Sequence, residues 1–271
     1  MTWIFEHEFM RNALAAGLLV SIGCGVIGSF VVLNRMVFIS AGVAHAAYGG
    51  IGLGYFFGFS PVIGAVGFSV VAALGMGAIE RRAQQRVDTV IGVIWAAGMA
   101  LGILLIDLSE GYKADLMSYL FGSILAIPLL DLWFMLALDG VIVLLTILYF
   151  KELLAMSFDE NFTRIQNVPV DRIHLVLQCM IGLTVVMMMR VVGLILVIAL
   201  LTIPPAISAL FTRDMRRMMI LASLLGMVFT TVGLVLSFTY DLTSGASIIM
   251  VSAVAYFLAL VLRRRGSHAA D

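Results

Sequence analysis

Apolar residues occur along this chain in long stretches, which short polar or charged breaks separate. A helix needs about 20 apolar residues to cross roughly 30 Å of hydrocarbon, and about nine of the stretches come close to or exceed that length. These stretches cover residues 12–33, 36–57, 61–78, 89–106, 132–150, 173–189, 191–211, 215–238 and 246–262. The pattern predicts an all-α polytopic membrane protein with about nine spanning helices, which form a single transmembrane domain over residues 1–271.

One apolar stretch, residues 116–127, is too short to belong to this series. At about 1.5 Å per residue its roughly 12 positions reach only about 18 Å, which is less than the thickness of the hydrocarbon. A helix that ends inside the membrane is tolerated only where protein covers its exposed backbone groups. We therefore expect a short re-entrant helix at residues 116–127.

The basic residues favour one orientation of these helices. If residues 116–127 do not cross, all but three of the 16 lysines and arginines lie on the same side of the membrane. The three exceptions are Arg11, Lys113 and Arg190. Because cytoplasmic loops are enriched in lysine and arginine, we expect the C-terminus to be cytoplasmic and the N-terminus to be outside.

Composition and charge exclude several classes of protein. The chain is 62% hydrophobic and only 12% charged, with a mean hydropathy of +1.13, so a water-soluble core could not bury its apolar surface. Its formal net charge is +0, which argues against nucleic acid as a partner. The sequence contains no P-loop motif, no evident nucleophile–base pair and no evident cluster of metal ligands, so we expect neither an ATPase nor another enzyme.

The longest polar stretch between spans, residues 151–172, lies on the predicted cytoplasmic side. Within it, residues 157–166 are typical of a short helix that is capped at its N-terminus by Ser157. Two acidic and three apolar residues complete the pattern, namely Asp159 and Glu160 in the first turn and Phe158, Phe162 and Ile165 on one face. Such a helix is either a knob that another protein binds or a connector that rests on the lipid headgroups.

A single histidine, His45, lies inside the second apolar stretch. Counted from Arg35 at about 1.5 Å per residue, it is about 15 Å deep, near the bilayer midplane. Neutral imidazole binds zinc and similar ions, and ionisable residues inside membranes usually have a function. The alternative is a histidine that only forms a hydrogen bond with a neighbouring helix. His45 is therefore a candidate metal ligand.

Asp139 is an ionisable residue in the fifth predicted span. An unpaired charge at such a depth costs roughly 2.5–3.5 kcal/mol on insertion scales, so Asp139 needs a partner or water. It is either a further metal ligand or a buried aspartate that is bonded to a neighbouring helix.

Prolines and glycines interrupt two of the spans. Pro204 and Pro205 each remove a backbone donor, so we expect that helix to kink or break there, with Thr202 and Ser208 bonding the freed carbonyl groups. Broken helices often line transport paths, which makes the two prolines candidates for a gating hinge. Gly50 belongs to a run of glycines that favours close packing between helices.

Several short motifs occur in order over nearly the whole chain. They are Gly28-Ser29-Phe30-Val31-Val32, Arg35-Met36, His45 with its trailing glycines, Asp88-Thr89 with Gly92, Asp115-Leu116-Met117, Tyr119-Leu120-Phe121-Gly122, residues 157–168, Val192-Gly193, Ile203-Pro204-Pro205-Ala206, and Tyr240-Asp241 with Ser244-Gly245. As a set they resemble the membrane permease subunit of the ABC-3 family, the ATP-binding-cassette importers of the zinc, manganese and iron type.

The resemblance implies a permease domain that moves a divalent metal ion past His45 by alternating access. It also implies a homodimer of such chains, two cytoplasmic ATPase subunits that bind ATP, and an extracytoplasmic metal-binding protein, in the plasma (inner) membrane of a bacterium or archaeon. The permease itself has no cofactor. The residues on which the ATPases would dock are Ser157, Phe158, Asp159, Glu160 and Phe162.

One position departs from the family pattern. An aspartate usually stands four residues before the histidine, on the same helical face, so that carboxylate and imidazole reach one ion together. Here that position is Ala41. Two copies of His45 across a dimer axis supply only two ligands, whereas zinc usually takes four.

The alternative function is a self-contained secondary transporter or channel for a small cation or polar solute, in which His45 and Asp139 form a relay.

Overall fold

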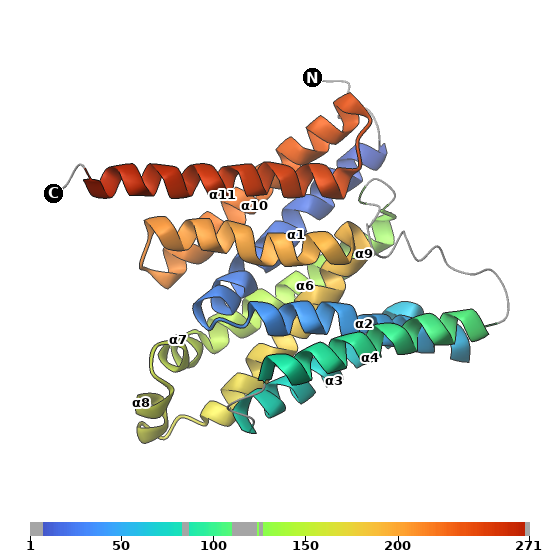
Figure 1. Ribbon diagram of the computed structural model, residues 1–271, viewed down its shortest axis with the longest axis horizontal. Helices are drawn as coiled ribbons and strands as arrows, with labels where there is room; N and C mark the ends of the chain where they lie inside the picture. Colours follow the sequence, from blue (N-terminus) through green and yellow to red (C-terminus); the bar gives the residue numbers. More distant parts are fainter. Residues whose placement is uncertain (1–7, 83–86, 110–123, 125–126, 269–271) are drawn as a thin grey trace.

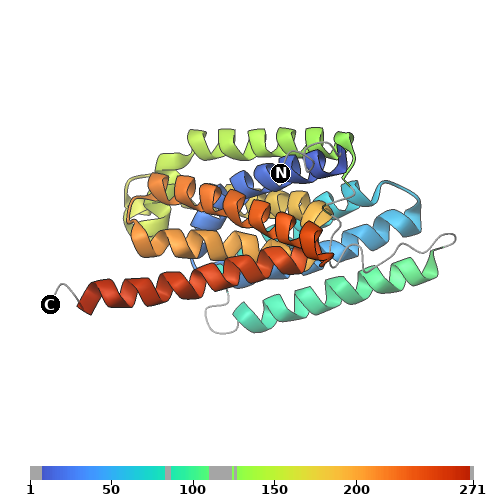
Figure 2. The same cartoon turned by 90° about the horizontal axis from the view of Figure 1, so that it is seen from above.

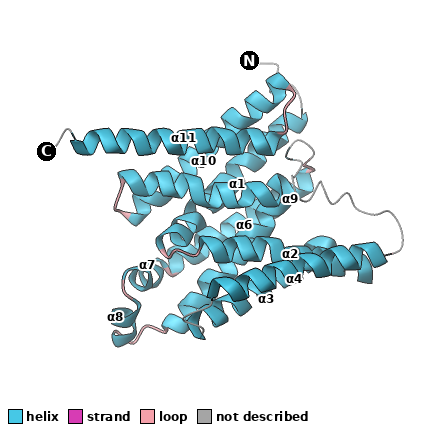
Figure 3. Ribbon diagram, viewed as in Figure 1, coloured by secondary structure: helices cyan, strands magenta, loops and turns pink. Residues whose placement is uncertain are grey.

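The computed structural model describes residues 8–82, 87–109, 124 and 127–268 (Figure 1). Within this part of the chain, Figure 3 shows helices joined by short loops and no strand. The helices are α1 (Glu8–Leu33), α2 (Val37–Phe57), α3 (Pro61–Arg82), α4 (Val87–Leu108), α6 (Leu129–Leu148), α7 (Phe150–Phe158), α8 (Glu160–Ile165), α9 (Val170–Phe211), α10 (Met215–Tyr240) and α11 (Ser244–His268). The predicted all-α fold is confirmed. The expected re-entrant helix at 116–127 lies outside the described residues except for Ile124 and Ile127.

Seven of these helices are long and apolar enough to cross a membrane, namely α1, α2, α3, α4, α6, α10 and α11. The remaining long helix, α9, is interrupted at Gly193, whose φ of 76° and ψ of 165° are not helical. A positive φ suits glycine because it has no β-carbon to clash with the backbone. This residue divides α9 into two segments, 170–192 and 194–211, and Figure 1 shows that α9 changes direction along its length. Seven helices and these two segments make nine, which equals the number of spanning helices expected from the sequence.

The polar connections that were expected on one side of the membrane lie together at one end of the bundle. At the left of Figure 1 are α7 and α8, the turn between α1 and α2, the turn between α9 and α10, and the C-terminal end of α11. Figure 2, which views the bundle from above, again places the C-terminus at the end that carries α7 and α8. The arrangement of the helices therefore agrees with the order of crossings inferred from the sequence.

Small residues bring α2 close to its neighbours in the interior. Among the seven long helices α2 is the most buried, and it packs against α3, α4 and α9. Gly50 meets the backbone of Gly64 in α3, and Gly52 meets the backbone of Gly102 in α4. Each glycine allows two helix backbones to approach more closely than a β-carbon would permit. His45, five residues before Gly50, is thereby held in the middle of a tight helix cluster.

Candidate functional site

His45 is half-buried on α2, and its ring is oriented by a local hydrogen bond. Its Nδ1 atom lies 2.8 Å from the carbonyl oxygen of Ala41, one turn earlier in the same helix. Because a carbonyl oxygen can only accept, this contact places the proton on Nδ1. The lone pair of the neutral imidazole is then on Nε2, the atom that remains for binding a metal ion.

Trp95 of α4 fixes the other side of the imidazole. The two rings have centroids 4.0 Å apart and planes tilted by 34°. Such a contact removes rotational freedom from both side chains, so the direction of His45 Nε2 depends on the packing of α4 against α2. No sequence pattern indicates this partner, because residues 45 and 95 lie on different helices.

The surroundings of His45 supply few further ligands. Ala41, which occupies the position one turn before His45, is buried and carries only a methyl group. Within the described part of the chain, no group of three or more histidines, cysteines, aspartates and glutamates could hold a metal ion. The described residues of one chain therefore bring fewer than three such ligands together at His45.

Asp139 lies on α6 and belongs to a different set of helix contacts. Its side chain is only 4% exposed, and neither carboxylate oxygen has a hydrogen-bond partner in the structure. Helix α6 packs on α1, α7 and α9, whereas α2 packs mainly on α3, α4 and α9. An unpartnered acid at this depth is costly in its charged form, so Asp139 is a candidate for proton or ion binding that is separate from His45.

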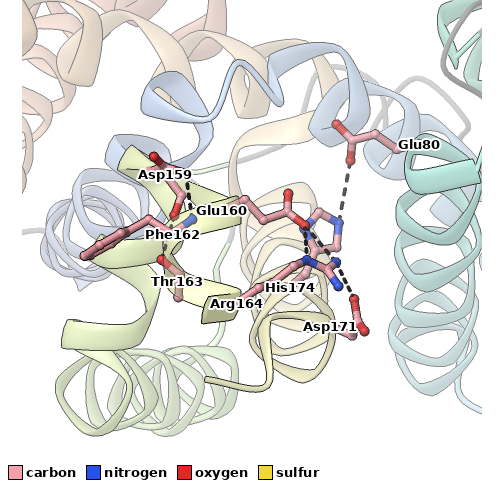
Figure 4. Close-up of polar contacts among 8 residues, drawn as sticks. All are labelled: Glu80, Asp159, Glu160, Phe162, Thr163, Arg164, Asp171 and His174. Atoms are coloured by element: carbon pink, nitrogen blue, oxygen red, sulfur yellow. Dashed lines mark hydrogen bonds and ion pairs between the residues drawn. The ribbon is translucent and has the colours of Figure 1, made fainter. Parts of the chain in front are cut away.

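The loop between α6 and α9 contains two short helices, α7 and α8, and Figure 4 shows how α8 is built. The predicted helix within 157–166 is present as α8, but the prediction that Ser157 caps it is wrong. Asp159 is the cap, because its Oδ1 accepts a hydrogen bond from the amide of Phe162 at 2.9 Å. Ser157 is still within α7, where its hydroxyl donates to the carbonyl of Leu153 at 2.7 Å. The chain leaves the helical conformation only at Asp159, so the cap falls there.

Charged side chains hold α8 against the start of α9. Arg164 donates hydrogen bonds to Glu160, one turn earlier, and to Asp171 of α9, each at 2.9 Å (Figure 4). The hydrogen bond with Glu160 raises the pKa of the Arg164 guanidinium, so the arginine stays charged throughout the physiological range. His174 of α9 lies 3.6 Å from Glu80 at the end of α3, which ties a second helix to the same region.

Three large apolar side chains of this loop are exposed. Phe158, Phe162 and Ile165 are 69%, 56% and 79% exposed. They are the residues that the sequence placed on one face. Contiguous exposed apolar side chains outside the membrane are a typical sign of a binding surface for another protein.

Asn34 links this loop to α2. Its amide nitrogen donates to the hydroxyl of Ser157 at 2.9 Å and to the carbonyl of Phe30 at 2.8 Å. The next residue, Arg35, has a φ of 59° and reverses the chain into α2. Asn34 was not among the predicted site residues, because only the fold brings residues 34 and 157 together.

The region around Pro204 and Pro205 differs from the expectation. The helix keeps helical dihedral angles across both prolines, and its break is at Gly193, so the expectation of a broken helix at the prolines is wrong. Pro205 leaves the carbonyl of Leu201 without its usual helical donor. Gly28 of α1 lies directly against that carbonyl, and a β-carbon there would be 2.8 Å from Pro205 Cγ and still closer to the oxygen.

The hydroxyl groups near the prolines bond other carbonyl groups. Thr202 donates to the carbonyl of Ile198 at 2.7 Å, and Ser208 donates to the carbonyl of Pro204 at 2.9 Å. We had predicted that these hydroxyl groups bond the carbonyl groups freed by the prolines. That prediction is wrong. The two prolines therefore lie at a packed contact between α1 and α9.

Comparisons with known proteins agree along almost the whole chain. A model of the ABC 3 transport family matches residues 6–263. The chain is 58% identical over 264 residues to an uncharacterized membrane protein of Synechocystis sp., covering 97% of this chain and 94% of that protein. It is 35% identical to the manganese transport system membrane protein MntC of Halalkalibacterium halodurans, over 94% of this chain and 88% of that one. Among solved structures, it is similar to PsaBC from Streptococcus pneumoniae in complex with Fab, with a TM-score of 0.86, 31% identity and coverage of 94% and 92% of the two chains.

Proposed function

Because this chain belongs to the ABC 3 transport family, we propose that it carries a divalent metal ion across the membrane past His45 by alternating access. The chain is the membrane permease subunit of an ABC transporter and not its ATPase. The observation that carries the proposal is the geometry of His45. Its Nδ1 is occupied by the carbonyl of Ala41, Trp95 fixes the ring, and Nε2 remains as a ligand inside the most buried long helix.

The transported ion is of the manganese, zinc or iron type. Relatives named as manganese transport proteins support this class of substrate. With Ala41 in place of a carboxylate, each chain offers one imidazole, so the ion is bound weakly during its passage. Weak binding suits a permease, because the ion must also leave, and an extracytoplasmic metal-binding protein supplies the affinity at the start.

The permease works as a homodimer with two cytoplasmic ATPase subunits, which hold the ATP. We assign the docking surface of each ATPase to α8 and the end of α7, where Phe158 and Phe162 are exposed and Ser157, Asp159 and Glu160 shape the loop. A capped helix is rigid enough to transmit force from closure of the ATPases. The bond from Asn34 to Ser157 then leads from this surface to the start of α2, which carries His45.

The bundle end that carries α7 and α8 faces the cytoplasm, so the C-terminus is cytoplasmic and the N-terminus is outside, in the plasma (inner) membrane of a bacterium or archaeon. The excess of lysine and arginine in the connections at that end supports this orientation. Gly50 acts as a packing residue between α2 and α3, and Pro204 and Pro205 act at the contact between α1 and α9, where alternating access would require the helices to move.

A transport assay with the complete transporter in proteoliposomes tests the proposal. We expect His45→Ala to abolish ATP-dependent uptake of radioactive manganese and zinc while the subunits still co-purify. His174→Ala, which removes a histidine at the α3–α9 contact, is the matched control and should retain uptake. Normal uptake by His45→Ala would refute a metal path along this side chain.

The same assay addresses the role of Asp139 and the alternative function. If Asp139 is a ligand or proton carrier, Asp139→Asn should lower uptake and uncouple it from ATP hydrolysis. The permease alone, in liposomes without ATPase subunits, should take up no metal. Uptake by the isolated chain would instead support a secondary transporter or channel.

A further inference from the structure

A groove of about 390 Å³ lies between α1, α6 and α10, away from His45. Its walls are aliphatic and methionine side chains, with Arg216 at one end. Only two other polar residues line it, Thr146 and Ser223. Each of their hydroxyl groups already donates to a carbonyl of its own helix, to Ile142 at 2.8 Å and to Met219 at 2.9 Å. Among the described residues, the lining of the groove is therefore apolar apart from the guanidinium group of Arg216.

The length of the groove matches one leaflet of a membrane. Along α10 it extends from Arg216 to Met227, which corresponds to about 16 Å at 1.5 Å per residue. Half of the hydrocarbon thickness is about 15 Å. On α6 the lining residues belong to the last two turns, so the groove occupies the leaflet nearest α7 and α8.

Arg216 is held at the mouth of the groove, where the headgroups of that leaflet lie. Its guanidinium carbon is 5.0 Å from the centre of the Phe150 ring, at the start of α7. Arg213 and Arg217 are exposed in the same turn, while the carboxylate of Asp214 accepts from the amide of Arg217 at 2.9 Å as the cap of α10. Arg216 therefore gives the groove a cationic end, and a guanidinium group matches the oxygens of a phosphate in geometry.

We propose that an anionic phospholipid of the cytoplasmic leaflet occupies this groove, with an acyl chain between α1, α6 and α10 and its phosphate on Arg216. The exposed walls support a lipid, because Ile147, Ile220 and Leu224 are 68%, 62% and 53% exposed within helices long enough to span a membrane. Cationic residues at the cytoplasmic surface attract anionic lipids. The lipid bridges α10 to the start of α7, and so stabilises the connection to the loop that contains α8.

Lipid retention by the complete transporter tests the proposal. The complex is purified from membranes that contain phosphatidylglycerol and phosphatidylcholine, and the retained lipids are measured by mass spectrometry. We expect the native protein to retain phosphatidylglycerol in preference to phosphatidylcholine. Adding phosphatidylglycerol back should raise the thermal stability of the native protein. Arg216→Gln should lose that preference, Arg216→Lys should keep most of it, and Arg263→Gln, at the end of α11, should leave it unchanged.

A second variant tests the groove rather than the charge. Leu224→Trp should fill the groove and lower phosphatidylglycerol retention even though Arg216 is present. Unchanged retention in both Arg216→Gln and Leu224→Trp would overturn the proposal. So would an Ile220→Cys variant that forms disulfide-linked pairs of this chain in native membranes, because a second copy would then cover the groove.

Discussion

Replacing Gly50 with alanine should force α2 away from α3. The new β-carbon would lie 2.7 Å from Phe68 Cβ and closer still to the carbonyl group of Gly64, whereas real β-carbons essentially never come within 3.0 Å of such atoms. The nearest obstacle is backbone, so no side chain can rotate away and the helices themselves must move. Overpacking costs about 1–3 kcal/mol, and we expect the upper part of this range. The higher helix propensity of alanine stabilises the helix by at most about 1 kcal/mol, so the free energy of unfolding should fall by about 2 kcal/mol in total.

The free energy of unfolding of the permease, measured by titration with a denaturing detergent in mixed micelles and followed by circular dichroism, checks this value. Gly67→Ala is the matched control, because it changes a glycine on α3 with no atom within 4 Å of the new β-carbon. It should be neutral or stabilising by up to about 1 kcal/mol. If Gly50→Ala proved as stable as Gly67→Ala, the inferred close approach of α2 and α3 would be wrong.

Three other substitutions test the loop and the metal path. Asn34→Ala should lower the amount of metal imported per ATP hydrolysed, because it breaks the bond between the loop and the start of α2; an unchanged ratio contradicts this. Asp159→Ala should destabilise α8 by about 1 kcal/mol and accelerate amide hydrogen exchange at residues 160–165, because it removes the cap. Asp159→Ser keeps a capping side chain and should keep the amides protected. Equal exchange rates in the two variants would exclude a capping role. Ala41→Asp should tighten the binding of manganese and zinc measured by calorimetry, because it adds a carboxylate one turn from His45, and Ala41→Asn should tighten it less. If Ala41→Asp bound both metals with the same affinity as the native protein, this reasoning would be wrong.

Much of the fold follows from the sequence, because a membrane span is a local property. Apolar stretches of about 20 residues must become helices in hydrocarbon, where backbone groups have no other partners. The exposed apolar side chains of the loop were also predictable, since Phe158, Phe162 and Ile165 follow helical spacing in the sequence. His45 could be singled out because a histidine is rare in such a setting.

Two local predictions were wrong because both depended on competition between neighbouring residues. Serine and aspartate are comparable caps, so the choice between Ser157 and Asp159 depends on where α7 ends, and there Ser157 is held by Asn34. The break in α9 is at Gly193 rather than at Pro204 and Pro205, where Gly28 of α1 packs against the carbonyl that Pro205 frees.

The sequence by itself determined that this chain is a bundle of spanning helices, which polar stretch between spans is the longest, and which histidine lies within an apolar stretch. Only the tertiary structure decided what surrounds that histidine. Trp95 reaches His45 from another helix, Asn34 meets Ser157 across 123 positions of the chain, and Arg216 comes to lie over Phe150 at the end of a groove. Span formation depends on the polarity of successive residues, whereas these contacts depend on which helix faces meet, and no local pattern of residues specifies that.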